Sequence, residues 1–123
     1  MPNFTNGSRR ILKAMDLSKL QGALGLSRRA GKCVAGDFAV ERAIKAGRVG
    51  LVVLDSGVSE ATRKRYQTFC GGRGIKLLEI PDMGRMIGKP DGKIAGITDQ
   101  RFIHMICSAA SRYDEEGLDE TNK

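Results

Sequence analysis

The residues in this chain whose types could do chemistry are mostly arginine, lysine and glycine, and they gather around two short segments. The first segment joins the end of one predicted helix to the start of the next, and the second is a loop with proline and glycine. A helix start offers free backbone amides with partial positive charge, which suit a phosphate or a base acceptor. Basic side chains beside it predict a site for a polyanion. The predicted site residues are Arg28, Arg29, Lys32, Gly36, Asp37, Phe38, Arg42, Lys89 and Lys93.

Residue patterns that would support catalysis are missing from the sequence. The single histidine, His104, lies in a predicted helix beside apolar residues, and no serine or cysteine stands in a motif that would pair with it. The acidic residues show no metal-ligand spacing, and no phosphate-binding loop of the P-loop type is present. Cys33, Cys70 and Cys107 match no metal pattern and are expected in the core of a protein from a reducing compartment. We therefore predict no enzyme, no metal and no cofactor.

The charge of the chain indicates its class of partner. The net charge is +7, and residues 113–123 hold five acids against one lysine, so residues 1–112 carry +11. Such an excess displaces counterions from phosphates, although it can also serve solubility alone. The sequence has no Trp and few aromatic residues on which successive bases could stack, and it shows no helix-turn-helix pattern. A helix start flanked by loops suits the shape of structured RNA better than a duplex groove.

The elements that must position these residues alternate between strand and helix. The predicted strands are 32–35, 51–54, 75–80 and 94–97, and the predicted helices are 8 or 16 to 30, 37–47, 59–70, 82–87 and 99–112. The first two strands and the helix between them predict a parallel right-handed crossover unit. Arg63, Lys64 and Arg65 are expected on a solvated helix face. The whole order predicts an α/β fold, a three-layer α/β/α sandwich with helices on both faces of a four-stranded mixed sheet.

The length of 123 residues predicts a single domain. We expect a partly helical N-terminal extension over residues 1–15, the binding domain over 16–112, and an acidic, disordered tail over 113–123. No signal peptide is recognisable, and no apolar run approaches the roughly 20 residues that cross a bilayer. These features predict a cytoplasmic, monomeric protein without a membrane partner.

The order of several motifs resembles a known family. Residues 24–55 read LGLSRRAGKCVAGDFAVERAIKAGRVGLVVLD, and GIK, MGRMIG and IAGITD follow at 74–76, 83–88 and 94–99. Together they resemble the L-seven-Ae / L-thirty-e ribosomal-protein superfamily, in particular its short bacterial YlxQ-like branch, over residues 17–110. The resemblance implies an L-thirty-e-like fold and binding to kink-turn or related structured RNA. It also implies ribosomal RNA, the ribosome or other ribonucleoproteins as partners.

In that family a Gly-x-Asn-Glu-x-x-Lys motif opens the second helix and contacts RNA. The matching residues here are Gly36 for the glycine, Phe38 for Asn, Ala39 for Glu and Arg42 for Lys, and the family's second contact loop falls on residues 89–93. The resemblance implies that Arg42 holds a phosphate, as an arginine fork can. Two alternatives stay open: a protein-interaction module of the same fold with Phe38 as anchor, and the substrate-binding half of an RNA-modifying system.

Overall fold

The computed structural model describes residues 14–89 and 91–121. Its elements, in chain order, are α1 (Ala14–Arg29), β1 (Cys33–Ala35), α2 (Asp37–Lys45), β2 (Leu51–Asp55), α3 (Glu60–Gly71), β3 (Lys76–Ile80), α4 (Met83–Met86), β4 (Ile94–Ile97) and α5 (Gln100–Thr121). The predicted alternation of helix and strand is therefore confirmed, with boundaries that differ by a few residues at most except at the end of α5. The predicted cap at Ser8 lies outside the described residues, and Asp16 lies within α1.

The four strands form one mixed sheet in the order β1-β4-β2-β3. β2 pairs with β3 in parallel, whereas β4 is antiparallel to both of its neighbours, β1 and β2. β1 and β2 thus run in the same direction, as predicted for the crossover unit, but β4 lies between them. Consequently the carboxyl ends of β1, β2 and β3 and the start of β4 meet at one edge of the sheet.

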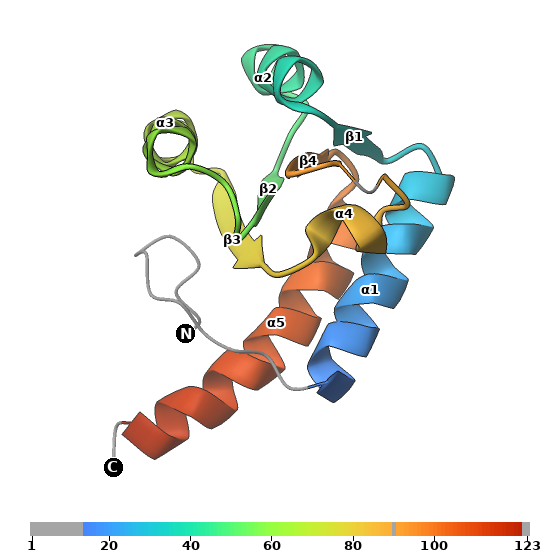
Figure 1. The fold of residues 1–123 in the computed structure, drawn as a ribbon, viewed down its shortest axis with the longest axis vertical. Helices are drawn as coiled ribbons and strands as arrows, with labels where there is room; N and C mark the ends of the chain where they lie inside the picture. Colours follow the sequence, from blue (N-terminus) through green and yellow to red (C-terminus); the bar gives the residue numbers. More distant parts are fainter. Residues whose placement is uncertain (1–13, 90, 122–123) are drawn as a thin grey trace.

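Helices cover both faces of this sheet (Figure 1): α2 and α3 lie on one side, and α1 and α5 lie on the other. β2 serves both sides, because its alternate residues belong to two separate core clusters. Leu51 and Val53 pack in the cluster under α1 and α5, and Val52 and Leu54 pack in the cluster under α2 and α3. This double burial is why the strand is apolar without alternation. The predicted α/β sandwich is confirmed.

Local signals define the helix ends. Ser59 caps α3, since its hydroxyl oxygen accepts a hydrogen bond from the Thr62 amide at 3.2 Å. Asp99 caps α5 by accepting from the Arg101 amide at 2.8 Å. α1 ends at Arg29, and Gly31, two residues further on, has a φ of 74°, the left-handed conformation that stops a helix. These ends agree with the predicted helix limits at residues 30, 59 and 99.

Arg63 corrects the prediction of a solvated basic face on α3. Its side chain is buried, and it donates to Glu79 Oε2 at 2.6 Å and also forms an ion pair with Glu60. Lys64 is exposed, as predicted, and Arg65 is half-buried. A charged group can be buried when it is paired and hydrogen-bonded, and Arg63 thereby ties α3 to β3.

The last helix is longer than predicted. The structure gives α5 as Gln100–Thr121, so helical backbone continues past residue 112, where we expected a disordered tail to begin. The proposed division into extension, domain and tail stays a prediction. Cys33, Cys70 and Cys107 are buried and free, which confirms them as core residues. In the described part of the chain, no helix is long and apolar enough to cross a membrane.

Candidate nucleic-acid interface

α2 begins at Gly36, directly beyond the end of β1. Gly36 has a φ of 101°, its amide donates to the Ile94 carbonyl at 2.9 Å, and its carbonyl accepts from the Val40 amide. A Cβ placed on Gly36 would stand 3.9 Å from Lys89 Nζ. The positive φ is therefore the reason for glycine here, because a Cβ would only reach ordinary van der Waals contact with Lys89. The structure brings together the helix start and one lysine of the predicted loop.

The loop before β4 is a tight turn closed by its own backbone. The Lys89 amide donates to the Gly84 carbonyl at 2.8 Å, and the Gly92 amide donates to the Lys89 carbonyl at 2.7 Å. A Cβ on Gly92 would meet that carbonyl oxygen at 3.0 Å, so the turn requires glycine there. Lys93 leaves the turn in another direction, and its Nζ lies 3.9 Å from Asp55 Oδ2. The two predicted lysines therefore have different surroundings.

Asp37 links α2 to α3. Its carboxylate forms an ion pair with Arg65, with Arg65 Nη2 at 2.6 Å from Oδ2, and it accepts a hydrogen bond from the buried Tyr66 hydroxyl. The hydrogen bonds from Arg65 lower the pKa of Asp37 below its usual range, and burial raises the pKa of Tyr66. Both carboxylate oxygens are engaged within the protein, so the geometry gives Asp37 a supporting role at the site.

Phe38 and Arg42 lie one helical turn apart on the outer face of α2. Phe38 is 74% exposed, and the Arg42 guanidinium carbon lies 5.5 Å from the centroid of its ring. Arg42 is exposed and forms no ion pair with any residue that the structure describes. Its charge is consequently available to a ligand, in contrast to the charge of Arg65.

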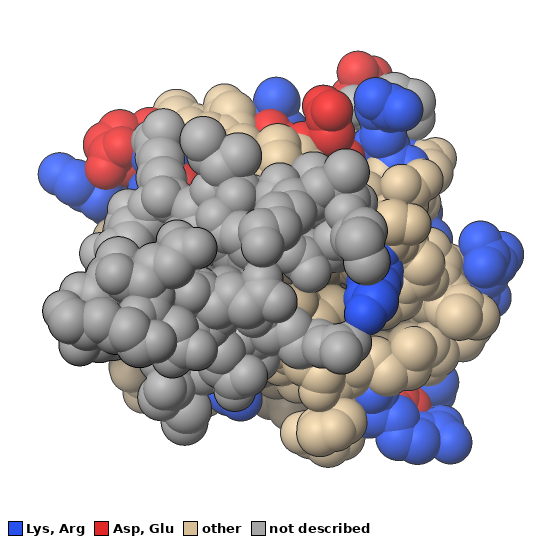
Figure 2. Space-filling view, turned by 90° about the horizontal axis from the view of Figure 1, so that it is seen from below, with Lys and Arg blue, Asp and Glu red and all other residues tan. Residues whose placement is uncertain are grey.

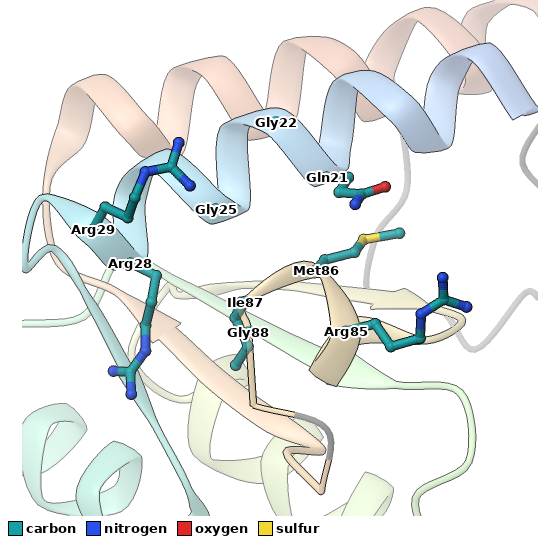
Figure 3. Close-up of a pocket in the computed structure, with 9 residues that line it drawn as sticks. All are labelled: Gln21, Gly22, Gly25, Arg28, Arg29, Arg85, Met86, Ile87 and Gly88. Carbon is teal, nitrogen blue, oxygen red and sulfur yellow. The ribbon is translucent and has the colours of Figure 1, made fainter.

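A pocket of about 420 Å³ lies between α1 and α4 (Figure 3). It is lined by Gln21, Gly22, Gly25, Arg28, Arg29, Arg85, Met86, Ile87 and Gly88. The two helices approach closely at Gly25, where a Cβ would meet the Met86 carbonyl at 3.4 Å and Arg29 Nη1 at 3.5 Å. Arg28 turns toward the sheet and donates to the Cys33 carbonyl at 3.3 Å. The pocket is therefore arginine-rich, and it places the two predicted arginines of α1 on its wall.

Arg85 is a residue of this pocket that the sequence prediction missed. It is exposed and stands 3.6 Å from Asp82, which is also exposed, so solvent screens the pair. Gly88 lines the pocket and Lys89 follows it, which connects the pocket to the α2 start through one loop. A basic residue in the last turn of a four-residue helix was the only sequence signal for Arg85. We define the basic surface as Arg28, Arg29, Arg42, Arg85 and Lys89.

Lys32 and Lys93 are the two predicted lysines outside this set. Lys32 lies close to Arg28, because its amide donates to the Ser27 carbonyl at 2.8 Å. Lys32 precedes β1 at the opposite end from Gly36, and its carbonyl accepts from the Thr98 amide at 3.0 Å. A strand rises about 3.3 Å per residue, so roughly 10 Å or more of backbone separates Lys32 from the α2 start. Lys93 faces the turn after β2. The set of predicted site residues stays a prediction.

Basic side chains also occur elsewhere on the molecule. Figure 2 shows a face on which Lys and Arg stand at separate points around the edge of the described surface, some of them beside acids. Isolated and paired charges of this kind hold a polyanion weakly compared with a continuous row. For the binding of a polyanion, the placement of the cations therefore matters more than the net charge of the chain.

The fold and the basic surface define a small α/β protein with a cationic edge. The chain matches the model of the Ribosomal protein L7Ae/L30e/S12e/Gadd45 family over residues 18–106, and it belongs to that family. It is 32% identical over 88 residues to the RNA-binding protein YlxQ of Bacillus subtilis, a match that covers 69% of this chain and 88% of that protein. These findings confirm the resemblance inferred from the motifs.

Two solved structures are also similar. A protein of unknown function from Bacillus halodurans has a TM-score of 0.70 and 31% identity, covering 74% of this chain and 95% of that chain. The 15.5kD RNA binding protein of Giardia lamblia has a TM-score of 0.66, covering 85% and 92%, but only 11% identity, so it supports the fold alone. Membership of a ribosomal-protein family agrees with the prediction that this chain is not an enzyme.

Proposed function

We propose that this chain is a cytoplasmic, non-enzymatic protein that binds structured RNA through the basic surface at the start of α2. The observation that carries the proposal is the approach of Lys89 to Gly36, which puts a cation beside the start of α2 at the edge of the sheet. The similarity to a protein named as RNA-binding gives independent support. The partners would be ribosomal RNA or another kink-turn-like RNA, within ribosomes or other ribonucleoproteins.

Each part of the surface has a distinct task in this proposal. Lys89 and Arg42 hold phosphates beside the α2 start, and Gly36 lets the RNA backbone approach without a side chain in the way. Arg28, Arg29 and Arg85 hold further phosphates along the pocket between α1 and α4. Selectivity for a bent RNA arises from the relative placement of these two groups of cations. Phosphate contacts by themselves recognise the shape of an RNA and not its sequence.

A gel-shift comparison tests the proposal. The probes are a kink-turn RNA and a regular RNA duplex of the same length, and the variant is Arg42→Glu. Arg73→Glu is a matched control, because Arg73 also lies beside an aromatic ring one helical turn earlier: its guanidinium carbon is 5.7 Å from the centroid of Phe69. Arg73 precedes β3 and therefore lies at the opposite edge of the sheet from the α2 start. The expected result is tighter binding to the kink-turn RNA, at least tenfold loss in Arg42→Glu, and less than twofold change in Arg73→Glu.

Equal losses in the two variants would show that only net charge matters and would contradict the proposed site. Equal affinity for both probes, with the Arg42→Glu loss retained, would keep RNA binding and remove the preference for the kink-turn.

A further inference from the structure

A groove of about 300 Å³ follows the outer face of α2. It is lined by small or apolar residues, namely two alanines of α2, Ala46 just after the helix and Val34 of β1, and by three larger side chains: Phe38, Arg42 and Arg48. Phe38 is in the first turn of α2, and Arg48 follows the end of the helix, so the groove extends along the length of α2 and shares Arg42 with the basic surface.

Phe38 is the exposed aromatic side chain of this groove. At 74% exposure it gains little from burial, and its ring contacts a guanidinium instead of an apolar neighbour. A planar ring with a cation beside it is the arrangement on which an unpaired nucleobase stacks. No acidic residue lines the groove, and neither Arg42 nor Arg48 forms an ion pair with a described residue. The positive charge of the groove therefore favours an anionic nucleotide over a peptide that has few acidic residues.

We propose that this groove binds one unpaired nucleobase of the RNA, stacked on Phe38, while Arg42 and Arg48 hold the phosphates on either side of it. The inference rests on the proposed function, and it adds a base-binding subsite where the family motif has a polar Asn. The alanines that line the groove leave room for the flat ring.

A single tryptophan tests the stacking directly. The chain contains no Trp, so Phe38→Trp creates one emitter at the groove, and its emission should be quenched when a base stacks on it. The probe is a kink-turn RNA with unpaired loop nucleotides, and the control probe is the same RNA made abasic at those nucleotides. Phe69→Trp is the matched control variant, because Phe69 also neighbours an arginine but is half-buried against Tyr66 on α3.

The expected result is quenching of Phe38→Trp by the intact RNA, little quenching by the abasic RNA, and none in Phe69→Trp. Phe38→Ala, at an exposed site where folding is not at risk, should bind the intact RNA about fivefold to a hundredfold more weakly and the abasic RNA unchanged. Equal quenching by both RNAs would overturn the base subsite. Tight, salt-dependent RNA binding without any response at Phe38 would overturn the subsite and leave the proposed function intact. Absence of RNA binding by the unmodified chain would overturn both.

Discussion

Asp37→Asn separates a supporting role of Asp37 from a role in contacting RNA. In the structure its carboxylate is engaged by Arg65 and by the Tyr66 hydroxyl, so it holds α2 against α3. The substitution removes the ion pair and keeps the shape of the side chain. We expect the fold to lose stability while RNA binding is retained or strengthened, because a negative charge near phosphates disappears.

The size of the stability loss follows from exposure. The Asp37 and Arg65 side chains are 49% and 37% exposed, so solvent screens the pair and limits it to the lower range of ion-pair energies, at most about 1 kcal/mol. The Tyr66 hydroxyl can still donate to the Asn oxygen, so that hydrogen bond is weakened and not lost. We expect Asp37→Asn to lower the free energy of unfolding by about 1 kcal/mol, or the Tm by roughly 4 °C.

The loss should depend on pH in a defined direction. The pKa of Asp37 is lower in the folded chain than in the unfolded chain, because Arg65 donates hydrogen bonds to it. Such a carboxyl stabilises the fold above its unfolded pKa of about 3.9, and the contribution disappears as the pH falls through the folded pKa. The difference between the natural chain and Asp37→Asn should therefore be full at pH 7 and shrink in acid below about pH 4.

Urea unfolding at pH 7 and pH 3, followed by circular dichroism, measures the stability, and fluorescence anisotropy measures RNA affinity. Asp91→Asn is the matched control, since Asp91 is exposed on the loop near the basic surface and has no partner among the described residues. It should leave stability within about 0.5 kcal/mol. A large loss of RNA affinity in Asp37→Asn with unchanged stability would refute this reasoning and make Asp37 a ligand contact.

Further predictions concern other contacts of the same fold. Lys89→Glu should weaken RNA binding at least tenfold, and Lys93→Glu should change it little, because Lys89 is the lysine of this loop that approaches the α2 start. Equal effects of the two substitutions in anisotropy titrations would contradict this difference between the lysines. Arg63→Met should lower the free energy of unfolding, measured in urea, by about 2 kcal/mol. This is less than the usual cost of breaking a buried ion pair, because the partners of Arg63 are partly exposed. Lys64→Met should change the free energy of unfolding little, and similar values for the two variants would argue against the burial of Arg63. Burial raises the pKa of Cys70 to about 11, so a thiol reagent at pH 8 should label it only at the rate of unfolding, and immediate labelling would contradict its burial.

The strands and helix ends were accessible from the sequence because their signals are local. The unbroken apolar run of Leu51–Leu54 is typical of a strand buried on both faces, and the side chains of Ser59 and Asp99 cap their helices by accepting from amides two or three residues away. The position of β4 between β1 and β2 was not accessible in this way, because strand order depends on contacts between distant segments.

The site was predicted less completely because a charge in a sequence does not reveal its partner. Asp37 and Arg65 are 28 residues apart, and only packing of α2 on α3 brings them together. The same holds for Arg63, which was expected in solvent and is buried against Glu79. Lys32 and Lys93 were grouped with the site by their nearness in sequence, but Lys32 stands at the far end of β1 from Gly36, and Lys93 lies beside Asp55.

The salt dependence of RNA binding tests the central claim most directly. About five phosphate contacts from the basic surface predict that the logarithm of the association constant falls with the logarithm of the salt concentration with a slope of about −4. The measurement is an anisotropy titration of the natural chain with a kink-turn RNA at several salt concentrations, repeated with Arg42→Glu, for which the slope should move toward zero by about one. Tight binding with a slope near zero, or a slope that Arg42→Glu leaves unchanged, would contradict the account.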